Sequence, residues 1–231
     1  MEPQIIHNPE GLVRMALEPG VSAEYLVLQD NPEHAGEADF EISLAENAFL
    51  KMVFLSLDGS ALRNRLRVSL HGRHACCDLA GLCLADGRQE MAYDILLTHA
   101  VPQCHSTQLF KNIVGGNGVT RFDGLIKVVP DAQQTEAYQA NHNLLASDTA
   151  RAFTRPQLEI YADDVKCSHG ATVGRLNPDE LFYMRTRGIP LAEAQLLQQM
   201  AFVGEVLEKI SFDELRESLQ ERVEARLRKI N

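Results

Sequence analysis

The sequence has no tryptophan, and it has only 9 phenylalanines and 5 tyrosines among 231 residues. This composition argues against a platform of aromatic rings that stacks nucleic-acid bases. Basic residues are also few, since 22 Lys and Arg face 32 Asp and Glu and give a formal net charge of -10. Because a protein that binds a phosphate backbone needs clustered positive charge, the sequence predicts no nucleic-acid partner.

Long apolar runs are missing as well. No run reaches the roughly 18 residues that a membrane span needs. The first residues, Met1-Glu2-Pro3-Gln4, lack the basic segment and apolar core of an export signal. The five cysteines are an odd number without the spacing of a disulfide framework. We therefore expect a cytoplasmic protein with reduced thiols and no membrane contact.

The distribution of glycine divides the chain into two parts. Of the 15 glycines, 13 lie before residue 176, which indicates a turn-rich first part and a helical last part. Within the first part, residues 62–70 alternate strictly, with leucine or valine at 62, 66, 68 and 70 and arginine at 63, 65 and 67. A period of two places these sets on opposite faces of a β-strand. We expect a β domain over residues 1–174 and a helical domain over residues 175–231.

Short alternating runs fill the β domain. They cover residues 25–28, 40–44, 49–56, 62–70, 76–84, 91–98, 107–114, 119–128, 158–161 and 165–173. Most of the connections are too short for a helix, which excludes a sheet built from β-α-β units. A sandwich, a barrel and a coiled β-solenoid all remain possible on periodicity alone. Residues 133–147 fit either a loop or a turn of helix.

Three helices are predicted after residue 176. Asn177 as N-cap and Pro178 at the first position begin a helix that should end near Gly188. Pro190 begins the second, and Ser211 is expected to cap the third. Their apolar stripes comprise Leu196, Leu197, Met200, Val203, Leu207 and Ile210, then Leu215, Leu219, Val223 and Leu227. Such stripes pack onto the β body, onto each other or onto a partner.

Cys167 and His169 form the sharpest candidate site. They are two residues apart in a predicted strand, so both side chains leave the same face about 6.6 Å apart. A thiolate and an imidazole can share a soft or borderline metal or part of an iron–sulfur cluster. They can also form a nucleophile–base pair. A buried thiol next to a histidine with a purely structural role is the third interpretation.

Other residue clusters carry weaker signals. The set His71, His74, Cys76, Cys77 and Cys83 matches no zinc-finger or zinc-ribbon spacing, and the same holds for Cys104-His105. The run 115–118 is a glycine-rich turn without the ending of a phosphate-binding loop. Asp163 and Asp164 point apart as strand neighbours. We expect these clusters to be structural.

Several stretches resemble the SufB/SufD family of the SUF iron–sulfur cluster assembly machinery. They are residues 109–111, 129–133, 139–148, 155–172 and 181–190. The motif Lys166-Cys167-Ser168-His169-Gly170-Ala171-Thr172 resembles the SufD branch more than SufB. The resemblance implies a mainly β fold, a right-handed parallel β-helix followed by a small C-terminal helical domain. It also implies that the helical domain docks the SufC ATPase and that SufB pairs with SufD through the β-helix.

The leading hypothesis is a non-enzymatic scaffold subunit. The cysteine and histidine of the family's SufD motif correspond to Cys167 and His169. The resemblance implies that they are ligands of a transient cluster, which is shared with a SufB-type subunit or with a second copy of the chain. We expect no permanently bound cofactor. For the SufC-type ATPase, the candidate contacts are Leu196, Met200, Val203, Leu215 and Leu219. Family members commonly carry a further helical domain before the β-helix, so we expect a fragment or a naturally short form.

Two alternatives remain open. One is a structural paralogue that pairs with SufB and holds no cluster. The other, from a different class, is a β-helix enzyme that acts on polysaccharides, which needs converging carboxylates and aromatic sugar platforms. The absence of tryptophan and the diverging Asp163 and Asp164 count against it.

Overall fold

A computed structural model gives the structure of the chain and describes residues 3–230. Within that range lie thirteen β-strands and three α-helices. The strands are β1 (Gln4–His7), β2 (Gly11–Leu17), β3 (Ser22–Asp30), β4 (Ala35–Leu44), β5 (Phe49–Asp58), β6 (Ala61–Leu70), β7 (Cys76–Ala85), β8 (Glu90–His99), β9 (His105–Val114), β10 (Val119–Val128), β11 (Thr135–Leu145), β12 (Arg151–Ile160) and β13 (Val165–Gly174). The helices are α1 (Pro178–Thr186), α2 (Leu191–Leu207) and α3 (Asp213–Ile230).

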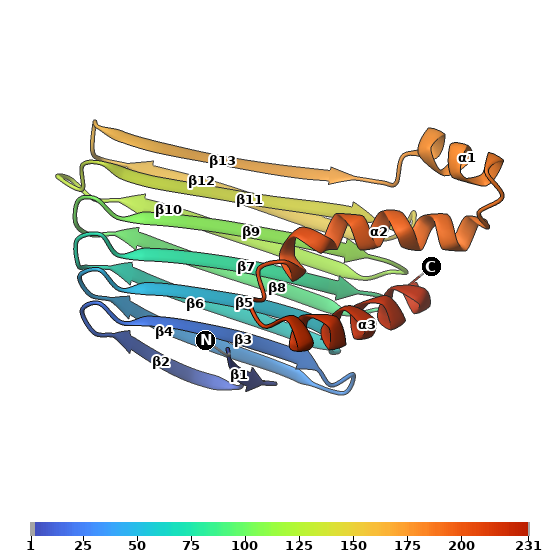
Figure 1. Ribbon diagram of the computed structural model, residues 1–231, viewed down its shortest axis with the longest axis horizontal. Helices are drawn as coiled ribbons and strands as arrows, with labels where there is room; N and C mark the ends of the chain where they lie inside the picture. The colour runs from blue at the N-terminus through green and yellow to red at the C-terminus, as the bar shows by residue number, and fades with distance from the viewer. Residues whose placement is uncertain (1–2, 231) are drawn as a thin grey trace.

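The strands form a parallel β-helix. Odd-numbered strands stack in one sheet in the order β1-β3-β5-β7-β9-β11-β13, and even-numbered strands stack in a second sheet from β2 to β12 (Figure 1). All pairings are parallel, and from β3 to β13 the odd strands begin 27 to 30 residues apart. This confirms the fold that the resemblance implied and removes the sandwich and the barrel.

Inward-facing side chains of the two sheets make the main core. Phe40, Phe54, Tyr93, Phe110 and Phe122 come alternately from the two sheets, and their ring centroids lie 5.0 to 5.7 Å apart in a continuous chain. Each such pair adds about 0.5–1.5 kcal/mol beyond the burial of apolar area. This aromatic chain locks the turns of the β-helix together from β4 to β10.

From β9 onward the interior of the odd-strand sheet also carries amide side chains. Gln108, Gln139, Asn141, Asn112 and Asn143 are buried polar residues of β9 and β11. Asn112 Nδ2 donates to Asn143 Oδ1 at 2.7 Å, and Asn143 Nδ2 donates to the backbone oxygen of Thr172 at 3.0 Å. Amide side chains inside the β-helix therefore hold β13 to the turn below it.

Helices α2 and α3 cover the outer face of the odd-strand sheet (Figure 1). Val203 and Leu219 are fully buried there in a second hydrophobic cluster that includes Val53 and Leu82 of the sheet. The half-buried Lys209 and Asp78 anchor the end of α2 with a 2.9 Å ion pair. Helix α1 buries none of its side chains and projects past the strand ends.

The helix predictions hold with two corrections. The Asn177 side chain accepts from the Asp179 backbone N–H, so the predicted cap of α1 is confirmed. Ser211 does not cap α3, because its hydroxyl accepts from Lys51 and its backbone N–H donates to Glu24. Leu197 is 46% exposed and does not belong to the buried stripe of α2.

The strands end at Gly174 and the first helix begins at Pro178, close to the predicted domain boundary. Because α2 and α3 share a cluster with the sheet, the division into two domains stays a prediction. None of the helices in residues 3–230 is long and apolar enough to cross a bilayer.

Candidate functional site

The candidate site lies on β13, the last strand of its sheet. In the parallel register Ala137 pairs with Cys167, and Gln139 pairs with His169. Ala137 and Gln139 are buried inside the β-helix, so the side chains of Cys167 and His169 project from the inward face of β13. The structure thus places the two on one face, about 6.6 Å apart along the strand.

The two side chains have different surroundings. Cys167 is half-buried against a small cluster that contains Ile126, Val128 and Ala162. This burial raises the pKa of the Cys167 thiol, and a hydrogen bond with the Ala137 backbone partly opposes the rise. His169 is exposed because none of the described strands lies beyond β13 to cover it. The thiol therefore stays protonated near neutral pH unless a metal ion replaces its proton.

Strands β12 and β13 form an open end of the β-helix. Each pairs with one neighbour among the described strands, so a full row of backbone donors and acceptors is unpaired on each. Ile160, Tyr161 and Val173 expose 40 to 58% of their surface there. Outside, Lys166 and Glu136 form an exposed 2.8 Å ion pair between β13 and β11. Unpaired edges of this kind are templates for pairing with another chain.

Within residues 3–230, no three His, Cys, Asp or Glu side chains come close enough to hold a metal ion together. Cys167 and His169 therefore offer at most two donors. Zinc sites and iron–sulfur clusters bind through about four protein ligands. This chain alone does not complete such a site.

The structure scatters the second set of histidines and cysteines. Cys77 and Cys83 are fully buried inside the β-helix, and burial raises the pKa of both thiols far above its usual range. Cys76 faces outward from the same strand. His99 is buried and bonds Ser106 Oγ through Nε2 at 2.9 Å. These residues serve the packing of the β-helix.

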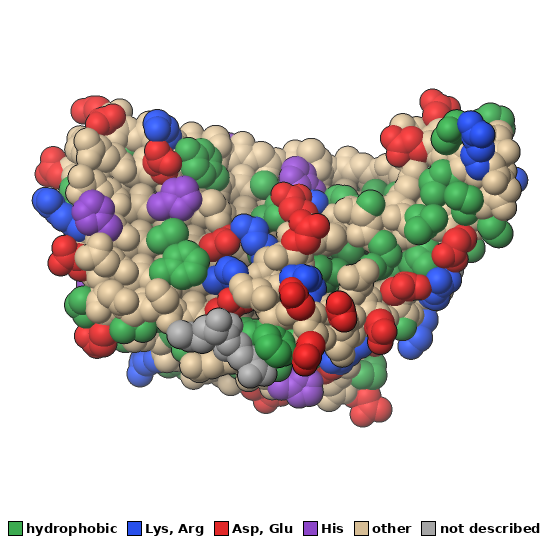
Figure 2. Space-filling view, in the orientation of Figure 1, with side chains coloured by type: hydrophobic (Ala, Val, Ile, Leu, Met, Phe, Trp, Pro, Cys, Tyr) green, Lys and Arg blue, Asp and Glu red, His purple; other side chains and the backbone are tan. Residues whose placement is uncertain are grey.

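The five predicted ATPase contacts are largely buried. Leu196, Val203 and Leu219 are at most 2% exposed, while Met200 and Leu215 pack against the same cluster. Their side chains contact the sheet and the other helices, so a partner cannot reach most of them. The large apolar side chains that the described helices expose are Phe182, Tyr183, Leu191 and Leu197 on α1 and the start of α2, and Figure 2 shows hydrophobic side chains gathered over these elements.

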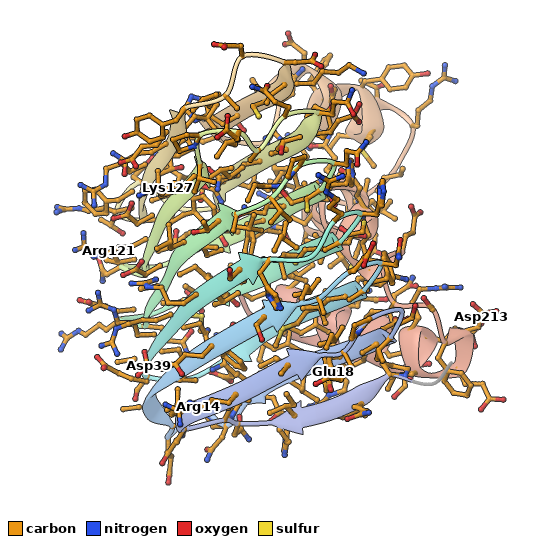
Figure 3. All side chains as sticks on the ribbon, turned by 90° about the vertical axis from the view of Figure 1, so that its left-hand side faces the viewer. Arg14, Glu18, Asp39, Arg121, Lys127 and Asp213 are labelled. Atoms are coloured by element: carbon orange, nitrogen blue, oxygen red, sulfur yellow. The ribbon has the colours of Figure 1, made fainter. Side chains whose placement is uncertain are left out.

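A hollow of about 1000 Å³ lies over the even-strand sheet, and no sequence motif predicts it. Figure 3 shows Asp39, Arg121 and Lys127 on this face, pointing away from the stack. Several of the charges that line it interact with one another, since Arg155 pairs with Asp123 and Arg63 pairs with Asp94. The Arg121 guanidinium lies 4.5 Å over the Phe153 ring.

Comparison with known proteins identifies the family. Residues 7–202 match the family described as SUF system FeS cluster assembly, SufBD core domain. The chain belongs to the SufBD family. The iron–sulfur cluster assembly protein SufD of Escherichia coli K12 is 37% identical over 198 residues, which make up 86% of this chain and 47% of that protein.

Two other SufBD family relatives are similar to a comparable degree. A cluster assembly protein of Synechocystis is 35% identical over 187 residues, or 80% of this chain and 41% of the relative. One from Mycobacterium tuberculosis H37Rv is 33% identical over 192 residues, or 80% of this chain and 48% of the relative. The chain thus spans less than half the length of each of these three relatives. The SufBD assignment leaves the polysaccharide-active alternative without support.

Proposed function

We propose that the chain is a non-enzymatic, SufD-like scaffold subunit of cytoplasmic iron–sulfur cluster assembly. It would present Cys167 and His169 at the open end of the β-helix as ligands of a growing cluster. One observation carries the proposal: both side chains project from the inward face of the last strand, where no further strand covers them. A thiolate with a nearby imidazole suits iron in an iron–sulfur fragment.

The cluster would be shared with a second subunit. Two donors leave a four-ligand site incomplete, and the unpaired backbones of β12 and β13 would bring the partner's ligands to the same place. The partner is a SufB-type subunit or, failing that, a second copy of this chain. The cluster is cargo that leaves after assembly and not a resident cofactor.

Anaerobic reconstitution with Fe²⁺ and sulfide tests the ligand role. The chain would be mixed with a SufB-type subunit, and the iron retained and the visible absorbance would be measured. We expect Cys167→Ser and His169→Ala to lower both signals, while Cys76→Ser, a control thiol on the outer face of β7, leaves them unchanged. Full cluster yield from both site variants would favour the structural paralogue, which pairs without binding iron.

We further propose that α1 and the start of α2 dock a SufC-type ATPase. The exposed Phe182 and Tyr183, 67% and 59% accessible, together with Leu197 offer an apolar surface that the β-helix does not use. Nucleotide chemistry would belong to that partner, because this sequence has no phosphate-binding loop. Movement of the ATPase would then act on α2 and α3, which pack directly on the sheet.

Point variants test this docking better than deletion of the helices, since deletion would expose the cluster beneath α2 and α3. We expect Phe182→Ala combined with Tyr183→Ala to weaken ATPase binding in calorimetry. Phe212→Ala is the matched control, because Phe212 is also exposed but precedes α3. Equal affinity for the double variant and the control would eliminate the surface.

A further inference from the structure

One inward row of the odd-strand sheet changes character along the stack. In register, the row runs from Tyr25 through Met52, Leu79, Gln108 and Gln139 to His169. The first three members are apolar or aromatic, and the last three are polar. Met52 and Leu79 are fully buried and fill the core well. Apolar packing alone therefore gives no reason for amides in the two turns before His169.

The two glutamines are linked to each other. Both are 2% exposed, and Gln139 Nε2 donates to Gln108 Oε1 at 3.0 Å. The backbone opposite makes room for this amide, because a Cβ at Gly124 would lie 2.5 Å from Gln139 Nε2. The glycine thus gives the Gln139 amide space, and the hydrogen bond directs its Nε2 toward Gln108.

The other end of the Gln139 amide is unsatisfied. Its Oε1 is buried and has no hydrogen-bond partner in the described structure. An unpaired buried acceptor is costly in a folded protein and calls for a functional explanation. The next residue in its row is His169, one strand away at the usual spacing of about 4.8 Å. An imidazole N–H is the donor that this oxygen lacks.

We propose that Gln139 is a positioning residue for His169. In this proposal the exposed His169 ring turns so that one ring N–H donates to Gln139 Oε1, which fixes the tautomer and leaves the lone pair of the other nitrogen for iron. Ligating histidines generally donate their second N–H to a carbonyl or carboxylate in this way. Gln108 holds the Gln139 amide through the hydrogen bond between Gln139 Nε2 and Gln108 Oε1. The inference rests on the proposed role of His169 as a ligand.

The tautomer of His169 can be read without iron. The full chain would be labelled with ¹⁵N-histidine, the His169 signals assigned by their loss in His169→Ala, and the ring ¹⁵N shifts recorded near pH 8, above the ordinary histidine pKa of about 6.5. We expect one dominant tautomer in the parent chain, a mixture in Gln139→Met, and restoration of one tautomer in Gln139→Glu, which keeps an acceptor. The same tautomer ratio in all three proteins would overturn the proposal.

A second measurement connects the positioning to metal binding. Co²⁺ would be titrated into each variant and followed by thiolate-to-metal absorption. We expect Gln139→Met to weaken Co²⁺ binding by about 10–100-fold, the usual effect of losing such a partner. Unchanged affinity would count against the proposal. Gln108→Met is the matched control for loss of a buried amide, and it should weaken binding less than Gln139→Met.

The ligand role of His169 and the positioning role of Gln139 can be tested separately. If His169→Ala leaves cluster yield intact while the tautomer still depends on Gln139, the ligand role falls and the contact stands. If His169→Ala abolishes the cluster but Gln139→Met changes neither the tautomer nor Co²⁺ affinity, the ligand role stands and the positioning role falls.

Discussion

The buried histidine His99 should make this protein sensitive to mild acid. His99 is 0% exposed, its Nε2 bonds Ser106 Oγ at 2.9 Å, and its Nδ1 has no hydrogen-bond partner among residues 3–230. Burial lowers the pKa of His99 to about 4, and the charge of the neighbouring His105 also lowers this pKa. In the unfolded chain the pKa returns to about 6.5.

The sign follows from the number of bound protons. Between pH 4 and 6.5 the unfolded state binds more protons at this residue than the folded state, so stability rises with pH across that window. Above the unfolded pKa the residue is neutral in both states and carries no penalty. At pH 5 the two pKa values correspond to a loss of about 2 kcal/mol in the free energy of unfolding.

Urea unfolding near pH 7.5 and pH 5 would measure this loss for the parent chain and for His99→Gln, which cannot titrate. Carboxylates with lowered pKa, such as Asp30 and Glu205, lose stability in acid in both proteins and cancel in the comparison. We expect the variant to lose about 2 kcal/mol less than the parent. Equal losses would refute the assignment of a buried neutral imidazole.

Three further outcomes follow from the packing. Leu219→Ala should lower the free energy of unfolding by about 2–5 kcal/mol, whereas Leu197→Ala, on the exposed side of α2, should stay within about 0.5 kcal/mol in urea melts. Gly81→Ala should cost about 1–3 kcal/mol in the same melts, because the added Cβ would lie 2.3 Å from Phe110 Cδ1. Asn143→Ala should speed amide hydrogen exchange in β13, because it removes the bond to the Thr172 carbonyl.

The sequence revealed the strands whose inward residues are apolar. Strand β6 is the clear case, since Leu62, Leu66 and Val68 face the core and three arginines face outward. Strand β11 lies in the segment that fitted either a loop or a helix. Its inward positions include Gln139, Asn141 and Asn143, so hydrophobic alternation is absent although the backbone is fully paired. Periodicity finds a strand only where the interior is apolar.

Edge strands were also hard to read. For β12 the sequence predicts only the run 158–161, whose first three residues belong to this strand, because Pro156 interrupts the alternation and lacks the N–H of a central strand. In the structure β12 pairs only with β10 among the described strands, so a proline is tolerated there. Strands β1 and β2 at the opposite end were missed, and their exposed Ile5 and Leu12 explain the weak pattern.

For the candidate site, the sequence identified the residues but not their neighbours. A spacing of two places Cys167 and His169 on one face, yet nothing local says that this face is the inward one. Gln139 lies 30 residues earlier and becomes a neighbour only through the register of β11 and β13. The helix stripes were predicted and are buried against the sheet, but an amphipathic pattern looks the same whether it covers a sheet or binds a partner, so the ATPase contacts stay a prediction.

The amide-rich interior near β13 suits an end that, in the proposed pairing, is either free or covered by a partner. If the last turns continued the aromatic chain of Phe110 and Phe122, the open end would expose a large apolar patch beside two unpaired strand edges, which promotes aggregation. Gln139 and Asn143 instead place polar groups in the last turns, and both are almost fully buried. Gln139 donates to Gln108, and Asn143 donates to the Thr172 carbonyl of β13. These amides thus hold the strand that carries the proposed ligands without adding an exposed apolar surface to the free end.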